Sequence, residues 1–136
     1  MRVGVLTGLT VEARLLDGLA GEPQSPLIAR AGACARRAHD EAERLVASGA
    51  IAIVSFGIAA GLDPQVRAGD LIFADRVILP SGRSIATDPE WLRSARSRAG
   101  RPNTFIGPVA GTDRLLATAV SIRARRRVPS LARDRD

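Results

Sequence analysis

The amino-acid sequence predicts an α/β fold with a largely parallel β-sheet. Short apolar runs of strand length alternate along the 136 residues with amphipathic segments of helix length. The expected order is β-α-β-α-β-β-α-β, and strands that alternate with helices form layers around a largely parallel sheet. Ligand sites in such folds lie at the carboxyl ends of the strands.

The first three expected elements occupy the N-terminal quarter. Residues 2–7 (RVGVLT) combine β-branched and small apolar side chains, which predicts a buried strand. Thr10 is the expected N-cap of a helix that runs to about Leu19, where glycines end it. Residues 26–32 (PLIARAG) predict a short second strand. The apolar side chains of the first helix share one face: Val11, Leu15, Leu16 and Leu19.

The middle of the chain predicts a surface helix and two strands. Residues 34–48 are alanine-rich and charged, which favours a helix, and Gly49 closes it. Residues 50–57 (AIAIVSFG) are apolar on both faces, so we expect this strand at the centre of the sheet. Residues 70–79 form the next, longer strand.

The last predicted elements precede a segment without periodicity. Asp88 is the expected N-cap of a helix with Pro89 at its first position. Residues 103–111 predict a further strand. Residues 119–136 show no clean period and are arginine-rich, which predicts a disordered tail.

The formal charge of +6 is unevenly distributed. Lysine is absent, and residues 1–122 hold 14 arginines against 12 acidic residues, whereas residues 123–136 hold 6 against 2. Such a tail could bind RNA or an anionic surface through phosphate contacts. The nearly balanced body and the low aromatic content of 3% disfavour specific nucleic-acid recognition.

Cysteine content and hydropathy indicate the cellular setting. Cys34 is the only cysteine, so neither an intramolecular disulfide nor a cysteine-based metal site is expected. The longest apolar stretches are strand-sized, which predicts no membrane span and favours a cytoplasmic location.

Five small or apolar residues follow the strand at residues 50–57: Gly57, Ile58, Ala59, Ala60 and Gly61. Small residues at a strand end let a ligand approach the backbone and offer amide N–H groups as donors. The stretch is no dinucleotide fingerprint, because Asp63-Pro64 and a second strand follow it instead of a helix. It is no P-loop either, since lysine is absent.

Glu12 is the candidate carboxylate of this sequence. It lies in the first turn after the first strand, where a helix N-terminus favours negative charge. The alternative interpretation is that Glu12 only stabilises the start of the helix and has no catalytic role. His39 lies among charges in mid-helix, which is typical of a surface residue.

Three segments together resemble the nucleoside phosphorylase and nucleosidase superfamily: RVGVLTGLTVEARLL, SFGIAAGLDPQVRAGDLIFADRVI and GPVAGTDRLLAT. This superfamily includes purine nucleoside phosphorylase and methylthioadenosine/adenosylhomocysteine nucleosidase, and the hopanoid-associated phosphorylases are the most similar branch. The resemblance covers residues 1–118 as one domain. It implies a three-layer αβα sandwich around a central mixed sheet, incomplete at the C-terminus.

The resemblance implies cleavage of the N-glycosidic bond of a purine nucleoside, by phosphate or by water. In the hopanoid branch this implies release of adenine from an adenosylated hopanoid precursor. The implied partner is a small-molecule nucleoside, and family members commonly assemble as homo-oligomers. No cofactor or metal is implied, except inorganic phosphate as the co-substrate of a phosphorylase.

The resemblance also implies a site. Glu12 matches the glutamate that orients the attacking water or a ribose hydroxyl, and residues 57–61 match the loop against the ribose and the nucleophile. Arg30, at the end of the second strand, is the candidate phosphate ligand. The expected ribose- and phosphate-binding residues are Thr7, Gly8, Arg30, Gly57, Ile58, Ala59, Ala60 and Gly61.

The sequence departs from the family pattern in three respects. Ile58 stands where many members have a hydroxyl residue, and Ala60 stands where glycine is usual. A later Met-Glu segment that grips the ribose and a later purine-side aspartate are missing. We therefore expect a C-terminally truncated or frameshifted member, and an inactive homologue is the alternative to an enzyme.

Overall fold

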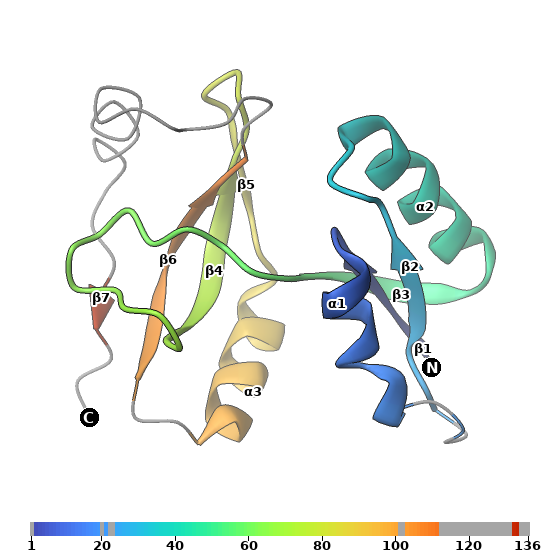
Figure 1. Cartoon of the computed structure of the whole chain (residues 1–136), viewed down its shortest axis with the longest axis horizontal. Coiled ribbons are helices and arrows are strands. Elements are labelled where there is room, and N and C mark those ends of the chain that lie inside the picture. Colours follow the sequence, from blue (N-terminus) through green and yellow to red (C-terminus); the bar gives the residue numbers. More distant parts are fainter. Residues whose placement is uncertain (1, 20, 22–23, 101–102, 112–131, 134–136) are drawn as a thin grey trace. The chain divides into compact units, whose positions relative to one another are not determined.

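The computed structural model describes residues 2–19, 21, 24–100, 103–111 and 132–133. The chain divides into two compact units, Met1–Ala59 and Ala60–Asp136, and each is described by itself (Figure 1). Both units contain a sheet and at least one helix, so the predicted α/β class is confirmed. One domain over residues 1–118 stays a prediction.

The first unit is a three-stranded parallel sheet with two helices. Its elements are β1 (Arg2–Thr7), α1 (Thr10–Arg14), β2 (Leu27–Arg30), α2 (Ala35–Ala47) and β3 (Ala50–Phe56). The strand order is β2-β1-β3. The connection from β1 to β2 and the connection from β2 to β3 run in opposite directions across the sheet. Because such connections are right-handed, α1 and α2 lie on opposite faces of the sheet (Figure 1).

The prediction of a central strand at residues 50–57 is wrong within this sheet. β1 lies between β2 and β3, and β1 is the strand that pairs with β3 among the described residues. Ile51 is 57% exposed and Ile53 is also exposed, which shows that apolar side chains on both faces do not guarantee burial. Leu45 of α2 packs instead over β1, where a Cβ on Gly4 would lie 3.1 Å from its Cδ1 atom.

α1 is shorter than the sequence predicts. Leu9, not Thr10, is the N-cap, and the helix ends at Arg14 before a 3-10 turn at Asp17–Leu19. Glu12 explains the start, because its side chain accepts the Leu9 amide, so no hydroxyl cap is required. Glycine disfavours helix, and Gly18 lies within the 3-10 turn. The predicted apolar face is largely exposed at Val11, Leu15 and Leu19.

The second unit contains a mixed sheet. Its elements are β4 (Leu71–Ile78), β5 (Ser84–Ala86), α3 (Pro89–Ala99), β6 (Thr104–Ala110) and β7 (Ala132–Arg133). The strand order is β5-β4-β6-β7, in which β4 and β6 are parallel and the two outer pairs are antiparallel.

Sequence reasoning missed β5 and β7. β5 returns along β4 through a tight turn, in which the Leu79 amide donates to the Arg83 carbonyl at 2.8 Å and Gly82 has a φ of 85°. Its three residues are too few to show a period. β7 belongs to the predicted disordered tail, of which residues 119–131 and 134–136 lie outside the described residues. Disorder of that remaining part stays a prediction.

The predicted cap of α3 is confirmed. The Asp88 carboxylate accepts the Glu90 and Trp91 amides, each at 2.9 Å, and Pro89 is the first helical residue. Gly100, with a φ of 55°, ends the helix in the left-handed conformation that glycine favours. None of the described helices is both long and apolar enough to cross a membrane.

Truncation of Phe105 should destabilise the second unit strongly. Phe105 of β6 is 1% exposed, so Phe105→Ala leaves a cavity and should lower the free energy of unfolding by about 3–5 kcal/mol. Urea unfolding followed by circular dichroism measures the loss. Ile85→Ala is the control, because Ile85 is 51% exposed and its truncation should cost less than about 1 kcal/mol. Equal losses for the two variants would contradict a core centred on Phe105.

Candidate functional site

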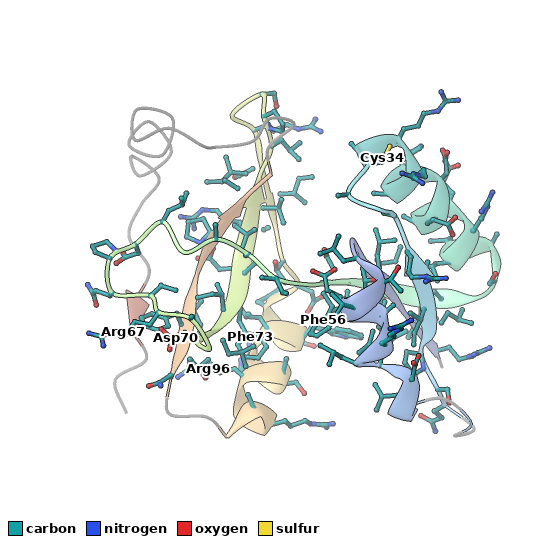
Figure 2. The ribbon with its side chains drawn as sticks, in the orientation of Figure 1. Cys34, Phe56, Arg67, Asp70, Phe73 and Arg96 are labelled. Carbon is teal, nitrogen blue, oxygen red and sulfur yellow. The ribbon has the colours of Figure 1, made fainter. Side chains whose placement is uncertain are left out.

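The carboxyl ends of all three strands of the first unit meet at one edge of its sheet. Thr7, the last residue of β1, is in register with Arg30 at the end of β2 and with Phe56 at the end of β3. Figure 2 shows Phe56 at this end of β3. Because ligands bind at the carboxyl ends of parallel strands, this edge is the candidate site.

The Glu12 carboxylate connects two of these strand ends. Its Oε2 atom accepts the amides of Gly8 at 3.0 Å and Leu9 at 2.7 Å, both just beyond β1. Its Oε1 atom accepts the amide of Ile58 at 2.8 Å, just beyond β3. The side chain is buried, with only 4% of the residue exposed. One carboxylate thus joins the loop after β1 to the loop after β3, where Ile58 lies 46 residues beyond Glu12 in the sequence.

Gly57 makes this arrangement sterically feasible. A Cβ atom at this position would lie 2.7 Å from Oε1 and 2.9 Å from Cδ of Glu12. Gly8 is less restricted, since its Cβ would lie 3.5 Å from Oε2, at ordinary contact distance. The glycine at the end of β3 is therefore required by the carboxylate that packs against it.

The three amides also determine the charge of the site. The amide of Ile58 is the main cause that lowers the pKa of Glu12, burial opposes it, and the Leu9 and Gly8 amides lower it further. Glu12 is accordingly a carboxylate at neutral pH and a weak base. A carboxylate offers about four lone-pair positions, and three of them are occupied. The fourth, on Oε1, can accept a hydrogen bond from a water molecule or a hydroxyl group.

The structure brings four of the predicted residues together within the first unit. Gly8, Glu12, Gly57 and Ile58 form the cluster. The Thr7 side chain is buried, and its Oγ1 atom donates to the Ala29 carbonyl at 3.3 Å, so this hydroxyl serves the packing of β1 and β2.

Arg30 lies at the same edge as a cation exposed to solvent. Its Nη1 atom donates to Thr10 Oγ1 at 3.4 Å, at the start of α1. Ala59 ends the first unit, and Ala60 and Gly61 begin the second. A Cβ on Gly61 would lie 2.9 Å from Val66 Cγ1, so this glycine serves local packing in its own unit.

Sequence reasoning missed Leu9, whose amide donates the shortest of the three hydrogen bonds. The signal was present, because a glutamate three residues after a helix N-cap commonly accepts the amide of that cap. It also missed the electrostatics of Cys34, the N-cap of α2 (Figure 2), where the Arg37 amide and side chain lower the thiol pKa. Among the described residues no cluster of metal-ligating side chains occurs.

Substitution of Gly57 by alanine should displace the Glu12 carboxylate. The clash breaks hydrogen bonds to buried amides, so we expect Gly57→Ala to lower the free energy of unfolding by about 1–3 kcal/mol. Gly18→Ala is the matched control in the same unit, because nothing lies within 4 Å of its Cβ position. In a Glu12→Ala background the cost of Gly57→Ala should shrink. If Gly57→Ala lowers the free energy of unfolding equally in the wild-type and Glu12→Ala backgrounds, as measured by urea unfolding, the clash with the Glu12 carboxylate is refuted.

The stability that Glu12 supplies should depend on pH. Its folded-state pKa is depressed, so the contribution is present above the ordinary glutamate pKa of about 4.3 and is lost as pH falls through the lower folded-state value. Glu12→Gln should therefore lower the melting temperature at pH 7, and the difference from wild type should shrink below about pH 4. Glu43→Gln, at an exposed position of α2, is the control. A difference that grows on acidification would contradict the assignment.

Comparisons with known proteins show the fold of this chain. No family model and no curated protein matches the sequence. Among solved structures, the chain is similar to the crystal structure of S-adenosylhomocysteine nucleosidase from Streptococcus pyogenes in complex with 5-methylthiotubericidin. The TM-score is 0.74 at 16% sequence identity, and the match covers 90% of this chain and 67% of that chain. The chain therefore has a nucleosidase-like fold.

Proposed function

We propose that this chain cleaves the N-glycosidic bond of a purine nucleoside, with Glu12 as its catalytic carboxylate. The observation that carries the proposal is the buried Glu12 side chain, which three amides hold at the carboxyl ends of β1 and β3. The nucleosidase-like fold supports it, because a ligand site is expected at this edge.

The proposed chemistry matches the electrostatics of Glu12. Loss of the base leaves a ribosyl group with oxocarbenium character, which a fixed negative charge stabilises. The lowered pKa keeps Glu12 ionised, so it provides this charge throughout the physiological pH range. The remaining lone pair of Oε1 orients a hydroxyl or a water molecule toward the reacting carbon.

The finer substrate assignment rests on the sequence resemblance. It favours adenine as the released base and an adenosylated hopanoid precursor as the nucleoside. A homo-oligomeric assembly and a cytoplasmic location belong to the same proposal. A panel of nucleosides must define this specificity.

Base release is the direct test. The purified chain should release adenine from adenosine or from 5′-substituted adenosines faster than it releases uracil from uridine, as followed by liquid chromatography. Glu12→Gln should lower kcat by about 100-fold or more, because it removes the fixed charge. Glu43→Gln is the control, because it makes the same substitution at an exposed position, and this variant should retain wild-type activity.

Two outcomes would overturn the proposal. Release of no base from any nucleoside by the folded protein would favour the inactive homologue. Equal activity of Glu12→Gln and wild type would show that base release does not depend on this carboxylate. Circular dichroism of each variant at the assay temperature separates a loss of chemistry from a loss of fold.

A further inference from the structure

We propose that the outer edge of β3, the edge that faces away from β1, is an assembly surface for a second copy of this chain. The second copy adds its own β3 in antiparallel orientation, so that the first-unit sheets of the two copies continue as one sheet. This inference concerns the association of the chain and does not depend on the reaction proposed above.

The two edges of the first-unit sheet differ in how well they resist pairing. β2 has only four residues, with Pro26 before it and Arg30 at its end. Short length, proline and charge are the features that keep an edge strand from pairing with another chain. β3 has seven residues (AIAIVSF) and contains neither proline nor a charged residue. Its outer edge therefore lacks the protection that β2 has.

The outer edge of β3 also has backbone groups to offer. Among the described residues, β1 is the strand that pairs with β3, and it does so on the opposite edge. The edge strands of the second unit are shorter, with three residues in β5 and two in β7. β3 is thus the longest edge strand that the described part of the chain presents to a partner.

Exposed apolar side chains accompany this edge on one face of the sheet. Ile51 and Ile53 share a face of β3, and Ile53 is 39% exposed, while Val46 of α2 is 58% exposed. A shallow groove separates α2 from β3, and its lining residues are His39, Ala42, Glu43, Val46, Ala47 and Ile53. Because burial of apolar surface is favourable, a partner that pairs with β3 gains stability from this groove as well.

The side-chain sizes along β3 indicate which partner fits. Antiparallel pairing of all seven residues with a second copy places Ile53 opposite the partner's Ile53. The other facing pairs are Ala50 with Phe56, Ile51 with Ser55, and Ala52 with Val54. Each of these pairs combines a small side chain with a larger one, so facing residues pack without collision. The strand is therefore complementary to itself in this register.

Symmetry and charge favour the same partner. A two-fold axis through the Ile53 pair is perpendicular to the sheet, so it places both α2 helices, and both grooves, on the same face. The chain has a formal charge of +6, which opposes association in general. Since β3 carries no charged side chain, no like charges face each other between the paired strands.

The first experiment measures the association directly. Sedimentation of the wild-type chain over a concentration series should show a monomer–dimer equilibrium without larger species. Ile53→Lys brings two ammonium groups together at the centre of the interface, so it should raise the dissociation constant of the dimer at least about tenfold. Ile85→Lys is the matched control, because Ile85 is an exposed isoleucine on an edge strand of the second unit. It should leave the dissociation constant unchanged.

The second experiment tests the register and remains informative if Ile53→Lys does not fold. Every variant carries Cys34→Ser, which removes the single native cysteine. Ile53→Cys meets its own counterpart at a Cα separation of about 4.5–5.5 Å, within disulfide range, so mild oxidation should link the dimer covalently. Ile51→Cys is the control, because its counterpart lies four residues along the strand, about 14 Å away. Adding Ser55→Cys to Ile51→Cys should restore the crosslink.

Three results would overturn the inference. The wild-type chain could remain a monomer at every concentration, folded Ile53→Lys could associate as tightly as wild type, or Ile51→Cys could crosslink as fast as Ile53→Cys. A wild-type monomer would leave the outer edge of β3 to a strand of a different polypeptide. Base release by a monomeric chain would overturn this inference alone, whereas a dimer that releases no base would overturn the proposed function alone.

Discussion

The hydrogen bonds between the Glu12 carboxylate and three backbone amides organise the candidate site. Two of these amides, of Gly8 and Leu9, lie within four residues of Glu12, and the third, of Ile58, lies 46 residues away. The local pair starts α1 without a hydroxyl cap. The distant amide connects the loop after β3 to the loop after β1. A single side chain therefore both caps a helix and joins two strand ends.

Burial of a charge is costly unless hydrogen bonds compensate it, and this requirement explains the surrounding residues. The amides replace the water that the carboxylate loses, and they lower its pKa although burial opposes them. Close approach of the carboxylate leaves no space for a side chain at position 57, so glycine stands there. The result is a fixed negative charge of low basicity, which suits the stabilisation of a cation better than the removal of a proton from a weak acid.

Local patterns in the sequence predicted much of the fold and part of the site. Strand-length apolar runs and helical segments gave the α/β class, because periodicity depends on neighbouring residues alone. Asp88 and Pro89 predicted the start of α3 for the same reason, and the structure confirms the cap. Glu12 was recognisable as a carboxylate after the first strand. The small residues after β3 indicated where a ligand could approach.

Tertiary structure alone decided what these residues contact. The bond from Ile58 to Glu12 joins segments 46 residues apart, and no local pattern encodes such a pair. The sheet order placed β1 between β2 and β3 because strand pairing depends on which segments meet, whereas the apolar composition of β3 suggested a central position. In the sequence, Gly57 is one of several small residues after β3. Only the position of the Glu12 carboxylate shows why a Cβ atom is excluded there.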